Sequence, residues 1–171
     1  RAFRKIGRGE GSTRIFGSID RAVTMLKRTP RIRNGRLMRR VVVVITDGYD
    51  SVDSIDQHDL IARANEAGVS VYSITLPSYL VGPSGKKRRA LTLLDASEIV
   101  DLTGGADFSA DSHDFTAAFK SIAEEIRSSY TLAFYPPDKD RHDGKLHQIR
   151  VEVKRPDAKI KTNRSTFLSQ K

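Results

Sequence analysis

The fold follows from residues 41–48, which read VVVVITDG. An unbroken run of β-branched residues forms strands readily, and it predicts a strand covered on both faces, as in the centre of a parallel sheet. The run stops at Thr46-Asp47-Gly48, so Asp47 is expected just beyond the carboxyl end of the strand. Ligands of open parallel sheets bind beyond that end. The stretch therefore predicts both the core of the fold and the place to look for a site.

The residues after this strand continue the pattern of a parallel sheet. The expected elements are a helix over about 57–67, a strand at 69–75, a helix over about 90–102, a strand at 106–108 and an amphipathic helix over about 112–128. Gly68 is a suitable residue to end the first of these helices, and Ser54 or Asp56 is suited to cap its start. Strands that alternate with helices predict an α/β fold with a parallel sheet flanked by helices.

A helix is also expected before the strand. Apolar residues recur at helical spacing over residues 15–26, after a glycine-rich loop that ends in Gly11-Ser12-Thr13 and before the breaker Thr29-Pro30. Residues 31–40 form a basic connector to the strand, and residues 77–89 form a Pro/Gly loop with the cations Lys86 to Arg89. Those cations suit a phosphate or polyanion, or an ordinary solvated loop.

The pattern changes after residue 128. Residues 130–135, 146–154 and 159–167 alternate in the manner of strands joined by turns, which predicts a C-terminal antiparallel β meander. We therefore divide the chain into an α/β domain over residues 1–128 and a β extension over residues 129–171.

Composition narrows the classes of function. The chain has 171 residues and no cysteine, which excludes a thiol nucleophile, a disulfide framework and a Cys-ligated metal site. Its net charge is +9, yet residues 1–40 hold 13 Lys and Arg against two acidic residues, so the remainder is slightly acidic. A basic segment on a nearly neutral body differs from a uniformly basic nucleic-acid binder. No apolar run approaches the roughly 18 residues that a membrane span needs.

Two local features could carry chemistry. Asp47 suits a hard divalent cation, although an Asp after a strand also commonly serves as a turn or capping residue. The hydroxyls of Gly11-Ser12-Thr13 lie where a helix N-terminus can hold a metal or anion, or where Ser and Thr simply cap the helix. The acidic residues 47, 50, 53, 56 and 59 lack the glycine and glutamate of a calcium loop, and the four histidines share no ligand spacing.

Taken together in this order and spacing, the segments resemble the von Willebrand factor type A domain. The resemblance rests on GSTRIFGSI at residues 11–19, RRVVVVITDG at 39–48, AGVSVYSI at 67–74, Thr103-Gly104-Gly105 and the helix with Phe115 and Phe119. The tail SYTLAFYP at residues 129–136 and DGKLHQIRVEVK at 143–154 are similar to a bacterial, von Willebrand factor A-related branch of exported proteins. The resemblance spans Gly11 to Phe167.

The resemblance implies a Rossmann-like sheet with a metal-ion-dependent adhesion site. In the family that site combines an Asp-x-Ser-x-Ser loop after the first strand with a Thr and an Asp from two later loops, which Thr13 and Asp47 match here. No Asp-x-Ser-x-Ser is present in this sequence. We therefore expect a chain that lacks the first strands of the domain, roughly 60 residues on ordinary element lengths. Two ligands fall short of the six or so oxygens that Mg²⁺, Mn²⁺ or Ca²⁺ requires, so weak or absent metal binding is expected.

The expected function is protein–protein recognition without catalysis. By the resemblance, Asp47 would hold the metal through water, Thr13 would ligate it directly or on a conformational change, and a partner's carboxylate would complete the shell. Ser12, Gly48, Tyr49 and Asp50 would form the rim, with Tyr49 able to contact the partner.

Two further expectations accompany this function, and two alternative functions stand beside it. The resemblance implies a periplasmic or extracellular location. The outer edge of the strand at residues 41–45 would be apolar and unpaired, so a missing segment or a second copy is expected to cover it. The alternatives are polyanion or nucleic-acid binding through residues 1–40 and 86–89, and a Mg²⁺-dependent hydrolase using Asp47 and Asp50, for which the sequence offers neither a nucleophile nor a phosphate cradle.

Overall fold

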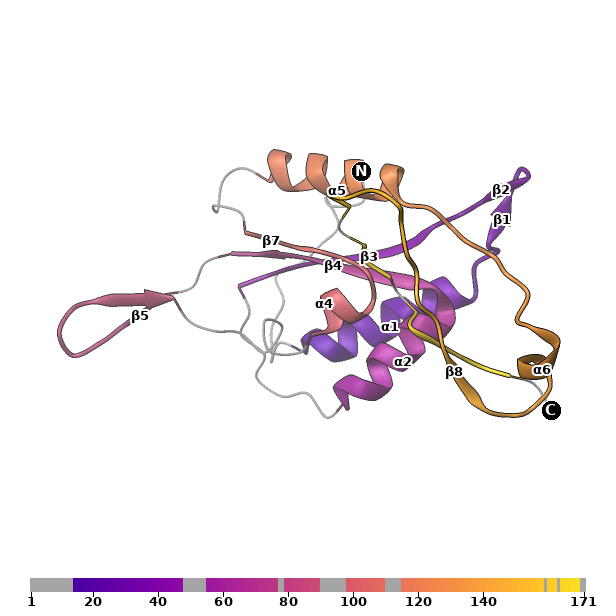
Figure 1. Ribbon diagram of the computed structural model, residues 1–171. Helices are drawn as coiled ribbons and strands as arrows, with labels where there is room; N and C mark the ends of the chain where they lie inside the picture. The colour runs from indigo at the N-terminus through magenta and orange to yellow at the C-terminus, as the bar shows by residue number, and fades with distance from the viewer. Residues whose placement is uncertain are drawn as a thin grey trace.

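The computed structural model describes residues 14–47, 55–76, 79–89, 98–109, 115–158, 160–162 and 164–169. Its body is a parallel sheet of three strands with helices on both faces (Figure 1). The strands are β3 (Arg40–Thr46), β4 (Val69–Thr75) and β7 (Asp107–Ser109), in the order β3-β4-β7. The predicted α/β, Rossmann-like fold class is therefore confirmed, with the strands at 69–75 and near 106–108 where they were expected.

Helices cover the two faces unequally. They are α1 (Ile15–Lys27), α2 (Gln57–Ala67), α4 (Ile99–Leu102) and α5 (Thr116–Ser128). On one face, α1, α2 and α4 pack against Val69 and Val71 of β4. On the other face, α5 packs against Tyr72 and Ile74. Alternate residues of β4 thus enter two separate cores, which makes β4 the buried central strand.

Local capping sets the bounds of α2. The side chain of Asp56 accepts hydrogen bonds from the backbone N–H groups of His58 (2.8 Å) and Asp59 (3.0 Å). The helix ends at Gly68, which adopts the left-handed conformation with φ +62°. Both features agree with the sequence prediction, because a capping Asp and a C-terminal glycine act through adjacent backbone groups only.

Arg40 connects the start of β3 to two helix ends. Its guanidinium is buried and donates hydrogen bonds to the carbonyl oxygens of Ala67 (2.7 Å) and Thr29 (2.6 Å), with a longer one to Lys27 (3.4 Å). Those carbonyls stand at the C-terminal ends of α2 and α1, where unpaired acceptors and the helix dipole favour a cation. Arg40 therefore holds both helices at the amino end of the sheet.

The position of β3 differs from the prediction of a central strand. Among the described residues β3 pairs only with β4, and Val43 and Ile45 are 36% and 46% exposed. The apolar run shows that the strand can be covered on both faces, but its neighbours are chosen by tertiary packing. The expectation of an open, apolar outer edge agrees with the described part of the chain.

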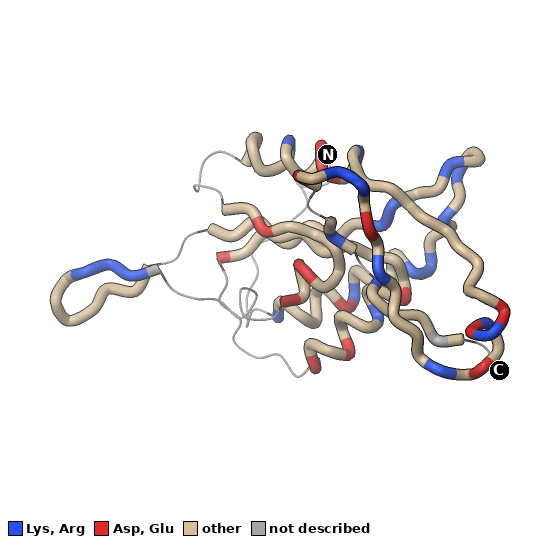
Figure 2. Tube along the Cα trace, viewed as in Figure 1, with Lys and Arg blue, Asp and Glu red and all other residues tan. Residues whose placement is uncertain are grey.

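Two hairpins occupy segments expected to be loops. The first joins β1 (Ile32–Arg33) and β2 (Arg36–Leu37) through Asn34-Gly35, both with positive φ. The second joins β5 (Tyr79–Val81) to β6 (Lys87–Arg89). Asn-Gly is a strong signal for a tight hairpin, and it identifies the first one in the sequence. Figure 2 shows Lys and Arg gathered on both hairpins, at opposite ends of the molecule.

The C-terminal extension holds less regular structure than expected. It contains the short helix α6 (Asp138–Arg141) and the antiparallel pair β8 (Leu146–Gln148) and β9 (Thr166–Leu168). The expected strand over residues 130–135 does not form, and Tyr130 and Leu132 are 88% and 72% exposed. An alternating apolar pattern makes a strand only where a neighbouring edge pairs with it, and no described strand does so here.

Two expected helices are only partly described. Residues 90–97 and 110–114 lie outside the described parts of the chain, so α4 and α5 confirm the later portions of the helices predicted over 90–102 and 112–128. In the described ranges no helix combines the length and the apolar character that crossing a membrane requires.

Candidate functional site

The carboxyl edge of the parallel sheet brings Asp47 to the surface. Asp47 follows β3 directly and is exposed. The pairing of β3 with β4 continues to the end of the strand, where the N–H of Leu76 donates to the carbonyl oxygen of Thr46 (2.8 Å). The N-terminus of α1 faces the same edge in Figure 1. The sheet therefore places the start of α1 and Asp47 on the side of the molecule where the sequence predicts a site.

The other predicted site residues lie outside the described residues. They are Ser12, Thr13, Gly48, Tyr49 and Asp50. Of the predicted metal ligands, Asp47 alone has a described position. The assignment of Thr13 to the metal, and of the others to the rim, therefore stays a prediction.

A second carboxylate, missed in the sequence, lies on β7. Asp107 accepts hydrogen bonds from the hydroxyls of Ser73 and Thr75 (3.1 Å from the Thr75 hydroxyl). Both hydroxyl residues are almost fully buried, at 1% exposure each. Their polar side chains share the face of β4 that is apolar at Val69 and Val71, and this break in the pattern is the signal that could have revealed the pair. Asp107 pairs with Ser73, which pairs with Val44, so Asp107 lies two strands across and three residues back from Asp47. On ordinary strand spacings this is roughly 14 Å, too far for the two carboxylates to share one ion.

The two basic segments of the polyanion hypothesis are not brought together. Within the described residues, the basic connector forms hairpin β1–β2 at one end of the sheet, and the cations of residues 86–89 lie on hairpin β5–β6 at the other end (Figures 1 and 2). Residues 31–40 and 86–89 therefore do not form one continuous basic groove.

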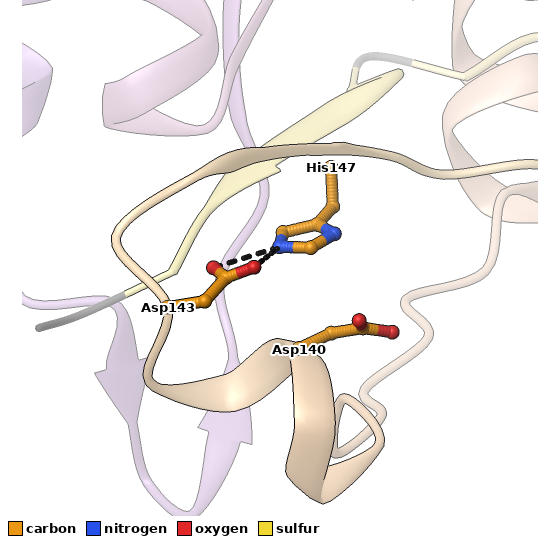
Figure 3. Close-up of side chains that lie close together, drawn as sticks. All are labelled: Asp140, Asp143 and His147. Atoms are coloured by element: carbon orange, nitrogen blue, oxygen red, sulfur yellow. Dashed lines mark hydrogen bonds and ion pairs between the residues drawn. The ribbon is translucent and has the colours of Figure 1, made fainter.

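A separate cluster of ionisable side chains lies in the C-terminal extension. Asp140, Asp143 and His147 offer ligand atoms that all lie within 4.8 Å of one another (Figure 3). Asp140 belongs to α6 and His147 to β8, while Asp143 lies in the turn between them. The Nε2 atom of His147 is 3.0 Å and 3.1 Å from the two carboxylate oxygens of Asp143.

Asp143 is held by several donors at once. Its carboxylate accepts from the backbone N–H of Lys145 (2.9 Å) and the hydroxyl of Ser169 (2.9 Å), besides the contact with His147. The hydrogen bond with His147, and then that from Lys145, lower the pKa of Asp143 far below its usual value. The Ser169 oxygen in turn accepts from the N–H groups of Asp143 (2.9 Å) and Gly144 (3.0 Å).

Aromatic contacts complete this cluster. The ring of His147 stacks on that of Phe167 with centroids 5.0 Å apart, and Phe134 meets Phe167 edge-on at 5.8 Å. Through these contacts Asp143 and His147 connect the region of β8 to Phe167 of β9 and to Ser169, which follows β9. The side-chain types suit a divalent cation, but the Asp143 oxygens already accept hydrogen bonds, so the arrangement is explained as a structural latch.

Comparisons with known proteins find similarity among solved structures. No family model matches the chain, and no curated protein matches it. Among solved structures, the chain is similar to the conserved hypothetical protein BatB from Bacteroides thetaiotaomicron, with a TM-score of 0.46 and 18% identity over 72% of this chain and 64% of that one. An aerotolerance-related membrane protein from Bacteroides fragilis NCTC 9343 gives a TM-score of 0.45 and 19% identity over 74% of this chain and 63% of that one.

A third solved structure is an uncharacterized membrane spanning protein from Vibrio fischeri, with a TM-score of 0.37 and 18% identity over 52% of this chain and 47% of that one. The chain thus spans less than two thirds of each of these proteins.

Proposed function

We propose that the carboxyl edge of the parallel sheet recognises another protein and carries out no catalysis, in the manner of a von Willebrand factor type A domain. One observation carries the proposal. An exposed acidic residue, Asp47, stands at the end of an apolar strand whose outer edge has no partner among the described residues. A carboxylate at this edge of an open sheet is where a ligand is expected.

The residues at hand fit a divalent cation only in part. Asp47 supplies one carboxylate, and Thr13 would add a hydroxyl, whereas Mg²⁺ or Mn²⁺ takes about six oxygens. A further strand running along the outer edge of β3, parallel to it, would end beside Asp47 and bring more ligands. A partner's carboxylate would then complete the shell. The chain by itself is accordingly proposed to bind the metal weakly.

Two hydroxyl side chains of β4 that lead to this edge are withdrawn from the surface, which favours recognition over hydrolysis. Ser73 and Thr75 are buried at 1% exposure and their hydroxyls are engaged by Asp107, so neither is presented to a substrate. A nucleophile needs both access and a base within hydrogen-bond reach. By the resemblance to exported bacterial proteins, we further propose a periplasmic or extracellular location.

The metal part of the proposal is tested by titrating the ¹⁵N-labelled chain with Mn²⁺ and following the broadening of amide signals. Broadening is expected around Thr46 and Asp47, and it should vanish in Asp47→Asn. The matched control is Asp143→Asn, which removes the carboxylate of the latch and should leave the broadening at Asp47 unchanged. Broadening centred on Asp143 and His147 would instead move the metal site to the C-terminal extension.

The affinity of the chain for Mg²⁺ or Mn²⁺ distinguishes a partial metal site from a complete one. Isothermal titration with Mg²⁺ or Mn²⁺ is expected to give binding weaker than micromolar for the chain alone, because most of the ion's oxygens would still come from water. Micromolar binding would show that the residues of this chain suffice, and the proposed need for ligands from outside it would be wrong.

A further inference from the structure

Hairpin β5–β6 exposes apolar and cationic side chains next to each other. Tyr79, Leu80 and Val81 of β5 are 59%, 57% and 66% exposed. In the antiparallel register Leu80 lies opposite Arg88 and Val81 opposite Lys87. Residues directly opposite each other in such a pair lie on the same face of the ribbon. Both faces of the hairpin therefore carry an apolar residue beside a cation.

Lys86, Lys87 and Arg88 of this hairpin have no acidic partner within the described chain. The ion pairs found there involve other residues, and Lys86, Lys87 and Arg88 are all exposed. The hairpin sheet consists of two strands, so among the described residues neither outer edge is paired. In the part of the chain that the structure describes, backbone groups without a partner strand, exposed apolar side chains and cations without an acidic partner thus coincide on one short element.

The hairpin also projects from the edge of the sheet that carries Asp47. β4 runs to the carboxyl edge and the chain leads from there to β5, and in Figure 1 the hairpin extends beyond that edge, away from the helices. Figure 2 shows its Lys and Arg as the outermost charges on this side of the molecule. A partner that approaches Asp47 from beyond the sheet would meet the hairpin.

We propose that hairpin β5–β6 is a docking arm for an extended, acidic segment of a partner protein. Such a segment would add as a strand to a free edge of the hairpin, with its backbone paired, its carboxylates beside Lys87 and Arg88, and its apolar side chains against Leu80 and Val81. Strand addition of this kind gains affinity from main-chain hydrogen bonds and specificity from alternate side chains. The inference rests on the proposed function in one respect, that the carboxyl edge is the recognition edge.

Neighbouring charges favour a protein segment over a membrane or a nucleic acid. Asp47 lies at the same edge, and Asp56 and Asp59 lie at the start of α2, the helix that follows β3 along the chain. A broad anionic surface or a long polyanion would bring its charges near these carboxylates as well as to the cations, and like charges repel. A short segment can contact the hairpin alone.

The test uses a fluorescein-labelled peptide of alternating glutamate and valine, and the same peptide with glutamine in place of each glutamate. Fluorescence anisotropy with the full chain is expected to show binding of the first and much weaker binding of the second. The double variant Lys87→Glu, Arg88→Glu should weaken binding by about 25-fold, since one exposed ion pair contributes up to about fivefold. Far-UV circular dichroism checks that the variant is folded.

A matched control comes from the other basic hairpin. The double variant Arg33→Glu, Arg36→Glu makes the same change in net charge on hairpin β1–β2, at the opposite end of the sheet. It should alter binding by less than about twofold, because a charge beyond the Debye length of roughly 10 Å is largely screened. Equal losses in the two double variants would show a non-specific effect of charge and overturn the proposal.

Two further outcomes decide between the docking arm and its alternatives. The difference between the two double variants should persist in EDTA, which makes it independent of any metal at Asp47. If EDTA removed it, the hairpin would have no separate role, while the proposed function would stand. Tighter binding of phosphatidylserine vesicles or of single-stranded RNA than of the acidic peptide would also overturn the assignment.

Discussion

The backbone of Gly105 lies directly against the carbonyl group of Val71. A Cβ atom built on Gly105 would be 1.8 Å from the Val71 oxygen and 2.7 Å from its carbonyl carbon. Gly105 follows the end of α4 and precedes β7, and its N–H donates to the carbonyl oxygen of Val100 (2.9 Å). The absence of a side chain thus allows the chain to pass close to β4 before it joins the sheet as β7.

Gly105→Ala is therefore expected to destabilise the protein severely. The nearest atoms belong to backbone, which cannot rotate away, so the cost should reach or exceed about 3 kcal/mol, the upper end of the range typical of overpacking. Thermal unfolding by circular dichroism should show a decrease of about 6–12 °C in Tm. Gly82→Ala is the control, because its added Cβ would meet only one atom at 3.7 Å. Equal Tm values for the two variants would contradict the close approach.

Arg40→Met should loosen both helix ends at the start of β3. The substitution keeps much of the apolar stem but removes the donors to the carbonyl oxygens of Ala67 and Thr29. Because hydrogen bonds from charged groups contribute about 1.5–3 kcal/mol each, a loss of at least about 3 kcal/mol in the free energy of unfolding is expected. Urea denaturation measures it. Arg36→Met, at an exposed position of β2, should change stability by less than about 0.5 kcal/mol.

Thr103→Val should leave a buried backbone donor of β4 without its acceptor. The buried Thr103 hydroxyl accepts from the backbone N–H of Val71 (3.0 Å) and donates to the carbonyl oxygen of Ile99 (2.7 Å). Valine has a similar shape but leaves the Val71 N–H unpaired, which costs about 1–3 kcal/mol. Native-state hydrogen exchange at Val71 should accelerate in Thr103→Val. It should change less in Thr103→Ser, which keeps the hydroxyl; the reverse order would refute the contact.

The latch in the C-terminal extension should make the stability of the protein depend on pH, and the lowered pKa of Asp143 gives the sign of that dependence. The pKa of Asp143 is lowered in the folded chain by the hydrogen bond with His147 and by that from Lys145. A lowered pKa contributes stability that is present above the unfolded value, about 3.9, and is lost as the pH falls through the folded value. The wild type should therefore lose stability below about pH 4, and Asp143→Asn should lack this part of the decline.

Titration of the Asp143 carboxyl carbon by NMR checks the same point directly. The group should remain ionised at pH 4 in the folded protein. A midpoint at or above the ordinary value for aspartate would show that the contacts with His147 and Lys145 do not persist in solution.

The outer edge of β3 should promote association of copies of the chain. Its side chains at Val43 and Ile45 are exposed and apolar, and among the described residues the edge has no partner strand. Sedimentation velocity is expected to show concentration-dependent association that Ile45→Lys reduces. Thr24→Lys, at an exposed position of α1, serves as the control and should leave it unchanged. Association that is indifferent to Ile45→Lys would place the interface elsewhere.

Several elements could be predicted because their causes are close together in the sequence. The bounds of α2 depend on Asp56 and Gly68 at its two ends, and β4 depends on the β-branched and aromatic residues within its own seven positions. The prediction of Asp47 at the carboxyl edge likewise needed only the end of an apolar strand. The sequence could not show that the expected strand over residues 130–135 does not form, because a strand requires a neighbouring strand as well as a suitable pattern.

The sequence by itself determined the class of fold, the residues that cap α2 and the position of Asp47 at the carboxyl edge of the sheet. Each of these follows from neighbouring residues. The tertiary structure alone decided that β3 is an edge strand within the described chain, that Arg40 is buried between two helix ends, and that Asp143 meets Ser169. These relationships join residues that are distant in the sequence, and no local preference specifies which distant groups will meet. Packing makes that choice, since each buried polar group must find a partner where the chain brings one.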